Sequence, residues 1–131
     1  MKRISLSPFS ASINLGLEYG YRGVSIKEHQ VIKFIQEYQE SLIKEKNIHL
    51  SCSISKIKIV LSGQVEPHLK IGFINYPKFA MKEPSLKREI EGLSKSLMKR
   101  FEQNRIVIEY LDETVMFEES DEIDERIKTG S

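Results

Sequence analysis

The sequence predicts an α+β domain in which two helices cover one face of an antiparallel sheet. Residues 103–118 alternate apolar and polar side chains on both sides of a short polar turn, which is typical of a β-hairpin. Residues 84–101 carry apolar side chains at helical spacing directly before that hairpin. Residues 25–47 show the same spacing after an alternating stretch at 11–19. The predicted order of elements is therefore β-α-β-β-α-β-β.

The first strand is predicted at residues 11–19, where apolar side chains recur at every second position: Ile13, Leu15, Leu17 and Tyr19. Gly16 lies on the opposite face, and a glycine inside a strand indicates close approach of another backbone or a ligand. Ser25 followed by Glu28 forms a capping box, which predicts that the first helix starts at Ser25. Asn47 is suited to end that helix as its C-cap.

The middle of the chain predicts two strands and a second helix. Residues 48–54 alternate as a strand, but the apolar positions after Ile54 change parity, which predicts a bulge near Ser55-Lys56. A turn at 62–64 leads into the next strand, which carries Leu69, Ile71 and Phe73. Pro84 is a good first residue for the second helix. That helix has one apolar stripe: Leu86, Ile90, Leu93, Leu97 and Phe101.

Two right-handed βαβ crossovers arrange these elements as a ferredoxin-like βαββαβ sandwich with an added C-terminal strand. Both helices then lie on one face of the antiparallel sheet, and the other face is open. Apolar residues occur among the polar ones expected there: Val60, Ile74, Val107 and Leu111. An open face of this mixed character predicts a homo-oligomer that associates through the sheet.

Several features of residues 55–117 recur together in a known family. Glu66-Pro67 precedes an apolar strand, Pro77 follows that strand, and Phe101 and Gln103 end the second helix before another apolar strand. In these features the segment resembles a bacterial domain family of unknown function that has the ferredoxin-like fold. The resemblance implies the fold. It implies no activity, because none of these motifs is catalytic.

Composition predicts one soluble domain, residues 1–118, followed by an acidic C-terminal tail, residues 119–131. The chain has 40% hydrophobic and 30% charged residues, and no apolar run approaches the roughly 18 residues that span a bilayer. We therefore expect a cytoplasmic protein without membrane contact. The single Cys52 excludes an internal disulfide, and we expect it to be buried and inert. We expect no metal and no cofactor, since no ligand-spaced cluster or phosphate loop is present.

The acidic composition of the tail is compatible with three alternative roles. Six acids lie between Glu118 and Glu125, followed by the two bases Arg126 and Lys128, so the rest of the chain is positively charged. The tail is then a solvated extension, an electrostatic shield over an anion site, or the means by which a regulatory protein binds a partner.

A ligand site is predicted where strands end and polar residues gather. Tyr76 offers an aromatic face for stacking, and Arg105 offers a planar fork for a carboxylate or phosphate. In the ferredoxin-like strand order we expect these two residues to lie at neighbouring strand ends. Arg105 also has a structural alternative, an ion pair with Glu118 across the hairpin. The predicted ligand-binding residues are Asn75, Tyr76, Lys78, Asn104 and Arg105.

A second set of residues points to catalysis and not to ligand binding alone. Glu66 and His68 lie on one face of a predicted strand at period two and form a candidate acid-base pair. No nucleophile elbow, zinc helix or kinase signature accompanies them. The basic residues are scattered among acids, so we do not expect nucleic acid as a partner. The sequence therefore favours a non-enzymatic, oligomeric protein that binds a small anionic or nucleotide-like ligand. The alternatives are a cofactor-independent enzyme that uses Glu66 and His68, or the regulator acting through the tail.

Overall fold

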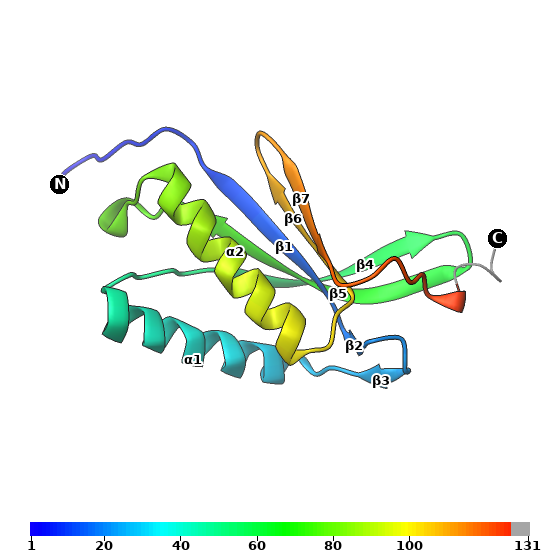
Figure 1. Ribbon diagram of the computed structural model, residues 1–131. Coiled ribbons are helices and arrows are strands. Elements are labelled where there is room, and N and C mark those ends of the chain that lie inside the picture. The colour runs from blue at the N-terminus through cyan, green and yellow to red at the C-terminus, as the bar shows by residue number, and fades with distance from the viewer. Residues whose placement is uncertain (127–131) are drawn as a thin grey trace.

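The computed structural model describes residues 1–126 and contains a five-stranded antiparallel sheet with helices on one face (Figure 1). The strands, in sheet order, are β4 (Ser53–Leu61), β5 (Gln64–Ile74), β1 (Ser10–Gly16), β6 (Arg105–Tyr110) and β7 (Thr114–Glu118). The helices are α1 (Glu28–Lys46) and α2 (Glu83–Arg100), with a 3-10 turn at Pro77–Phe79. A separate small hairpin joins β2 (Glu18–Tyr19) to β3 (Val24–Ser25).

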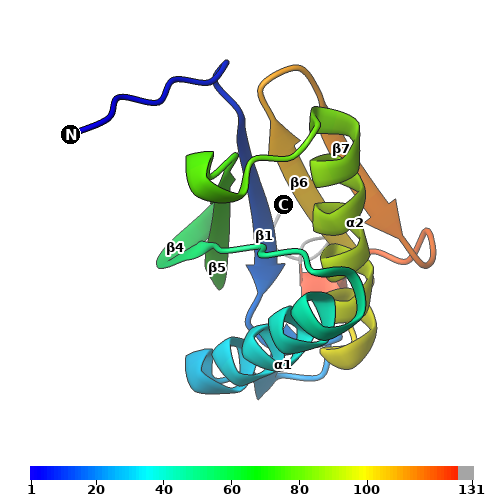
Figure 2. The same cartoon turned by 90° about the vertical axis from the view of Figure 1, so that its left-hand side faces the viewer.

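The predicted fold class is confirmed. The central strand β1 pairs with β5 on one side and with β6 on the other, both antiparallel, and β7 is added beyond β6. Figure 2 shows both helices on the same side of the sheet. This order is the ferredoxin-like arrangement with one additional strand.

The core lies between the helices and the sheet. The inward-facing residues of the three central strands are almost completely buried: Ala11, Ile13, Leu15, Leu69, Ile71, Phe73, Ile106 and Ile108. The stripe predicted on α2 packs on them, and Leu93 is 1% exposed. Gly92 lets α1 and α2 approach, because a Cβ at this position would lie 3.0 Å from the Tyr38 hydroxyl.

The start of α1 differs from the prediction. The helix begins at Glu28 with Lys27 as N-cap, and the Lys27 backbone N–H donates to the Gln30 side chain at 2.8 Å. Ser25 instead belongs to β3, where it pairs with Glu18, so it cannot cap the helix. The predicted C-cap is confirmed, since Asn47 adopts a left-handed backbone with φ of 53°.

The parity change near Ser55 does not come from a bulge. Residues 48–52 are not a strand, and β4 pairs with β5 from Ser53 to Leu61 without interruption. Ile54 lies opposite the core residue Ile71, whereas Ile57 and Ile59 lie on the other face of the same strand. Leu50 is buried in the core, and its carbonyl accepts a hydrogen bond from Gln39 at 2.9 Å. Cys52 is half-buried against the same core, and burial raises the pKa of its thiol.

The hairpin of β4 and β5 projects past the rest of the sheet, as Figure 1 shows. The pairing of β1 with β5 ends at Gly16 and His68, whereas β4 and β5 remain paired as far as Leu61 and Gln64. Apolar side chains on this projection are exposed, with Val60 at 66%. Within residues 1–126, no helix combines the length and the apolar character needed to cross a membrane.

Truncation of the core side chain of Leu93 tests this packing. We expect Leu93→Ala to lower the free energy of unfolding by about 2–5 kcal/mol, because it leaves a cavity between α2 and the sheet. Leu111→Ala is the matched control: this leucine is 69% exposed, and the expected change is below about 0.5 kcal/mol. Urea denaturation measures both, and equal losses in the two variants would contradict the assigned core.

Candidate active site

A pocket with a volume of about 370 Å³ lies at the end of β1, beyond the point where the central strands stop pairing. Its walls come from four segments that are distant in sequence. The first segment is the end of β1 and the residues after it, of which Gly16, Leu17, Glu18, Gly20, Tyr21, Gly23 and Ser25 line the pocket. The others are residues 64–68 at the start of β5, residues 103–105 at the start of β6, and Asp124 with Arg126 in the tail.

Strand register explains why these segments meet. Gly16 is the last residue of β1 and pairs with His68, near the start of β5. The register of β1 with β6 continues toward Arg105, the first residue of β6. Backbone hydrogen bonds then fix the loop after β1, from Leu17 N to Pro67 O at 3.0 Å and from Gly20 N to Glu102 O at 2.9 Å.

Gly16 forms the closely packed floor of the pocket. A Cβ at this position would lie 2.9 Å from Gln103 Oε1 and 3.5 Å from His68 Nε2, so the close approach predicted at Gly16 is made by two side chains. Gln103 is held in place because its amide nitrogen donates to the carbonyls of Glu18 at 2.8 Å and Phe101 at 2.9 Å. Its carbonyl oxygen therefore faces Gly16.

Asn104 fastens the tail to the start of β6. Its amide nitrogen donates to the carbonyls of Ser120 and Glu122, both at 3.2 Å. Its side-chain oxygen accepts from Ser120 Oγ at 3.0 Å, and its backbone carbonyl accepts from Glu119 N at 2.9 Å. The described part of the tail, residues 119–126, is thus packed on the domain, and residues 127–131 lie outside the described residues.

Arg105 makes the ion pair with Glu118 that was the structural alternative to ligand binding. Its other donors reach the Tyr21 hydroxyl at 3.1 Å and the Ser120 carbonyl at 3.3 Å. The hydrogen bond to Glu118 is the main cause that raises the pKa of Arg105 above its ordinary value. The guanidinium therefore ties together β6, β7, the loop after β1 and the tail.

Arg126 lies between two carboxylates at one wall of the pocket. Asp124 is 5% exposed and accepts hydrogen bonds from the backbone and Nε of Arg126, at 2.9 and 3.0 Å. On its other edge Arg126 donates to both oxygens of Glu18, with Nη1 at 2.9 Å from Oε1. The hydrogen bond from Arg126 holds the pKa of Asp124 below its usual range. Two carboxylates and one guanidinium give this group a net negative charge.

Glu66 and His68 both line the pocket, as their spacing along one strand face predicted. Within residues 1–126, the Glu66 carboxylate makes no hydrogen bond or ion pair. The Nδ1 atom of His68 lies 3.3 Å from the Glu66 carbonyl, and Nε2 faces Gly16. These two side chains thus remain available, whereas the charged groups around them are paired.

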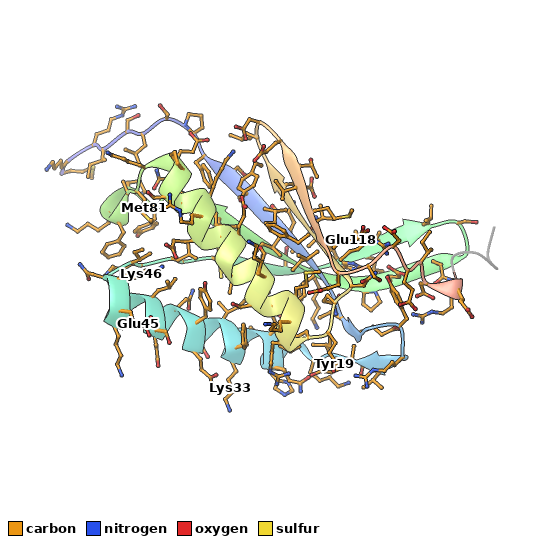
Figure 3. All side chains as sticks on the ribbon, viewed as in Figure 1. Tyr19, Lys33, Glu45, Lys46, Met81 and Glu118 are labelled. Atoms are coloured by element: carbon orange, nitrogen blue, oxygen red, sulfur yellow. The ribbon has the colours of Figure 1, made fainter. Side chains whose placement is uncertain are left out.

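The structure does not bring all five predicted ligand residues together. Asn75 closes the loop after β5 through hydrogen bonds with Met81, at 2.8 and 3.0 Å. Tyr76 stacks on Phe79 with ring centroids 6.0 Å apart, and exposed Lys78 lies in the same 3-10 turn. Figure 3 shows Met81 and Glu118, the partners of Asn75 and Arg105, far apart from one another.

Tyr76 and Arg105 are therefore not neighbours as expected, and the direction of the strands explains why. Both β5 and β6 run antiparallel to β1, so they run in the same direction. The start of β6 then lies at the same end of the sheet as the start of β5, with β1 between them, and the end of β5 lies at the opposite end. Asn104 and Arg105 lie at the pocket, and Asn75, Tyr76 and Lys78 do not. That the five residues bind a ligand stays a prediction.

Three charged residues that line the pocket were not among the predicted site residues: Glu18, Asp124 and Arg126. Arg126 has one signal in the sequence, since it is the first base after six acids. Within the described part of the chain, no group of three or more histidine, cysteine, aspartate or glutamate residues is placed to hold a metal ion.

Comparisons with known proteins give two solved structures of similar fold. One is a phage SAM lyase in its apo state, with a TM-score of 0.71 and 21% identity over 91% of this chain and 95% of that chain. The other is a phage SAM lyase in complex with S-methyl-5'-thioadenosine, with a TM-score of 0.63 and 20% identity over the same shares of the two chains. No family model and no curated protein matches the sequence.

These comparisons overturn the functional prediction from sequence. A non-enzymatic binding protein was favoured because no catalytic motif could be found, yet both structures that share the fold are of an enzyme. The prediction failed because the residues at the pocket come from four separate segments, and no short motif contains them.

The attachment of the tail can be tested at Asn104. We expect Asn104→Ala to raise amide hydrogen exchange in residues 119–126 by about tenfold or more, because it removes three side-chain hydrogen bonds to the tail. Asn75→Ala is the matched control, since Asn75 makes its hydrogen bonds at the other end of the sheet. Unchanged exchange in the Asn104 variant would show that other contacts hold the tail.

Proposed function

We propose that this protein is an enzyme that cleaves S-adenosylmethionine (SAM) at a carbon–sulfur bond and releases S-methyl-5'-thioadenosine. The observation that carries the proposal is the fold shared with a SAM lyase over 91% of the chain, combined with a pocket at the strand ends. A pocket of about 370 Å³ falls within the range of small-molecule sites.

The charges around the pocket favour a cationic ligand. Three acids line it, Glu18, Glu66 and Asp124, against the two permanent cations Arg105 and Arg126. The resulting net negative charge suits the sulfonium of SAM and disfavours the anionic ligand expected from the sequence. The same net negative charge disfavours nucleotides, because they carry anionic phosphate groups.

The reaction needs little from the protein beyond orientation and one proton transfer. When the bond between sulfur and the amino-acid chain breaks, its electron pair stays on sulfur, and the positive sulfonium becomes a neutral thioether. In an elimination, a base removes a proton from the neighbouring carbon, and that electron pair forms the new double bond. Glu66 and His68 are the candidate bases, because their side chains line the pocket and are available.

A homo-oligomer remains part of the proposal. The open sheet face has exposed apolar side chains on its two edge strands, Ile59 in β4 at 40% and Met116 in β7 at 51%. Exposed apolar area of this kind is typical of an interface. We also propose the cytoplasm as the place of action, since SAM is a metabolite of that compartment.

Catalysis by Glu66 can be tested directly. We expect the purified protein to convert SAM to S-methyl-5'-thioadenosine, and Glu66→Gln to lower the rate about 100-fold or more, as for loss of a general base. Glu45→Gln is the control, because Glu45 is exposed on α1, far from the pocket (Figure 3). Chromatography measures the product, and its absence with the wild-type protein would contradict the proposed function.

The second product tests the route. Vinylic protons in its NMR spectrum are expected for an elimination. A cyclic ester would show that the substrate's own carboxylate displaces sulfur, and would contradict a base role for Glu66 and His68.

Assembly through the open face gives a separate prediction. We expect light scattering to report at least twice the 15.2 kDa of one chain, and the double variant Ile59→Lys/Met116→Lys to be monomeric. Ile43→Lys is the control, since Ile43 is 42% exposed but lies on α1. A wild-type protein with the mass of one chain would contradict the oligomer.

A further inference from the structure

We propose that Glu18 and Arg126 recognise the α-amino-acid end of the substrate, and that the C-terminal tail is part of the site because it supplies Arg126. The proposal rests on the proposed function for the identity of the substrate. Its basis is an arginine–glutamate pair on the wall of the pocket, contributed by two segments that are 108 residues apart in sequence.

The three charged groups of this wall differ in how far solvent reaches them. The side chain of Asp124 is 6% exposed, whereas those of Glu18 and Arg126 are 29% and 46% exposed. Asp124 thus anchors one edge of the guanidinium inside the protein. The opposite edge, which carries the contact with Glu18, is open to a ligand in the pocket.

The chemistry of this open contact matches a zwitterion. A guanidinium binds a carboxylate through two parallel hydrogen bonds, and Glu18 already occupies Arg126 in that way. The carboxylate of an α-amino acid can take the place of Glu18 on Arg126, and Glu18 can then accept hydrogen bonds from the adjacent ammonium. Every charge keeps a partner in this exchange. Partly exposed ion pairs contribute little to stability, so the exchange costs little.

The path of the tail explains how Arg126 reaches the pocket. Asn104 holds Ser120 and Glu122 at the start of β6. At the other end of the segment, the Arg126 carbonyl accepts a hydrogen bond from Gln64 at the start of β5, at 3.1 Å. The tail is therefore fixed on both sides of the pocket, and Arg126 is held across from Glu18. A sequence of mostly acidic residues thus delivers one cation to the site.

Calorimetry with three probes tests separately how the protein binds each end of the substrate. S-methyl-5'-thioadenosine carries only the nucleoside end, L-methionine only the amino-acid end, and S-adenosylhomocysteine carries both. We expect Arg126→Ala to weaken binding of S-adenosylhomocysteine about tenfold or more, to abolish measurable binding of L-methionine, and to leave binding of S-methyl-5'-thioadenosine within twofold. Glu18→Gln should show the same selectivity, and Arg126→Lys should recover part of the affinity.

Arg22→Ala is the matched control. Arg22 also pairs with a glutamate, Glu102, but it does not line the pocket, so all three affinities should remain unchanged. Equal weakening of S-adenosylhomocysteine and S-methyl-5'-thioadenosine in the Arg126 variant would overturn the proposal, because it would mean that Arg126 only holds the pocket together. Unchanged affinity for S-adenosylhomocysteine would overturn it as well.

Failure of this inference can be told from failure of the proposed function. If the wild-type protein cleaves SAM but the Arg126 variants keep their affinity for S-adenosylhomocysteine, only the inference is wrong. If the wild-type protein forms no S-methyl-5'-thioadenosine from SAM yet loses L-methionine binding in the Arg126 variant, the function is wrong and the recognition of an amino acid stands. A wild-type protein that forms no S-methyl-5'-thioadenosine from SAM and binds none of the three probes overturns both.

Discussion

The pairing of β1 with its two neighbours is the constraint on which the rest of the structure depends. Its inward side chains Ile13 and Leu15 are completely buried, so the register of β5 and β6 against β1 cannot slip by one residue without turning core residues to solvent. That register also ends β1 at Gly16, beside the starts of both neighbours. The pocket lies at this edge because three strands begin or end there and their loops must turn back over it.

Charge pairing then determines which side chains of the pocket remain free to act. Arg105 is bound to Glu118, Tyr21 and the tail, and Arg126 is bound to Asp124 and Glu18. A paired group can hold a wall or exchange one partner for a ligand, but it is poorly suited to remove a proton. Glu66 and His68 differ from their neighbours in this respect, and for that reason we propose them as the catalytic bases.

The fold was predictable because period-two and period-3.6 patterns report burial directly, as the residues of α2 and the final hairpin show. Local capping was less predictable: Ser25 has the sequence of an N-cap, but pairing with Glu18 places it in β3. The location of the site was predicted only in part, again because long-range strand pairing decides it. Tyr76 and Arg105 were assigned to one edge of the sheet, although strand direction places them at opposite ends. The spacing of residues in the sequence carries no information on such long-range neighbours. It therefore could not predict the contact between Arg126 and Glu18 either.

The location of the nucleoside is the most direct test of this account. A crystal structure of the protein with S-methyl-5'-thioadenosine is predicted to place the ligand in the pocket lined by Gly16, Glu66 and Gln103, with its sulfur toward Glu66. A ligand bound instead at the other end of the sheet, on the exposed rings of Tyr76 and Phe79, would contradict the account and return the site to the residues first predicted from the sequence.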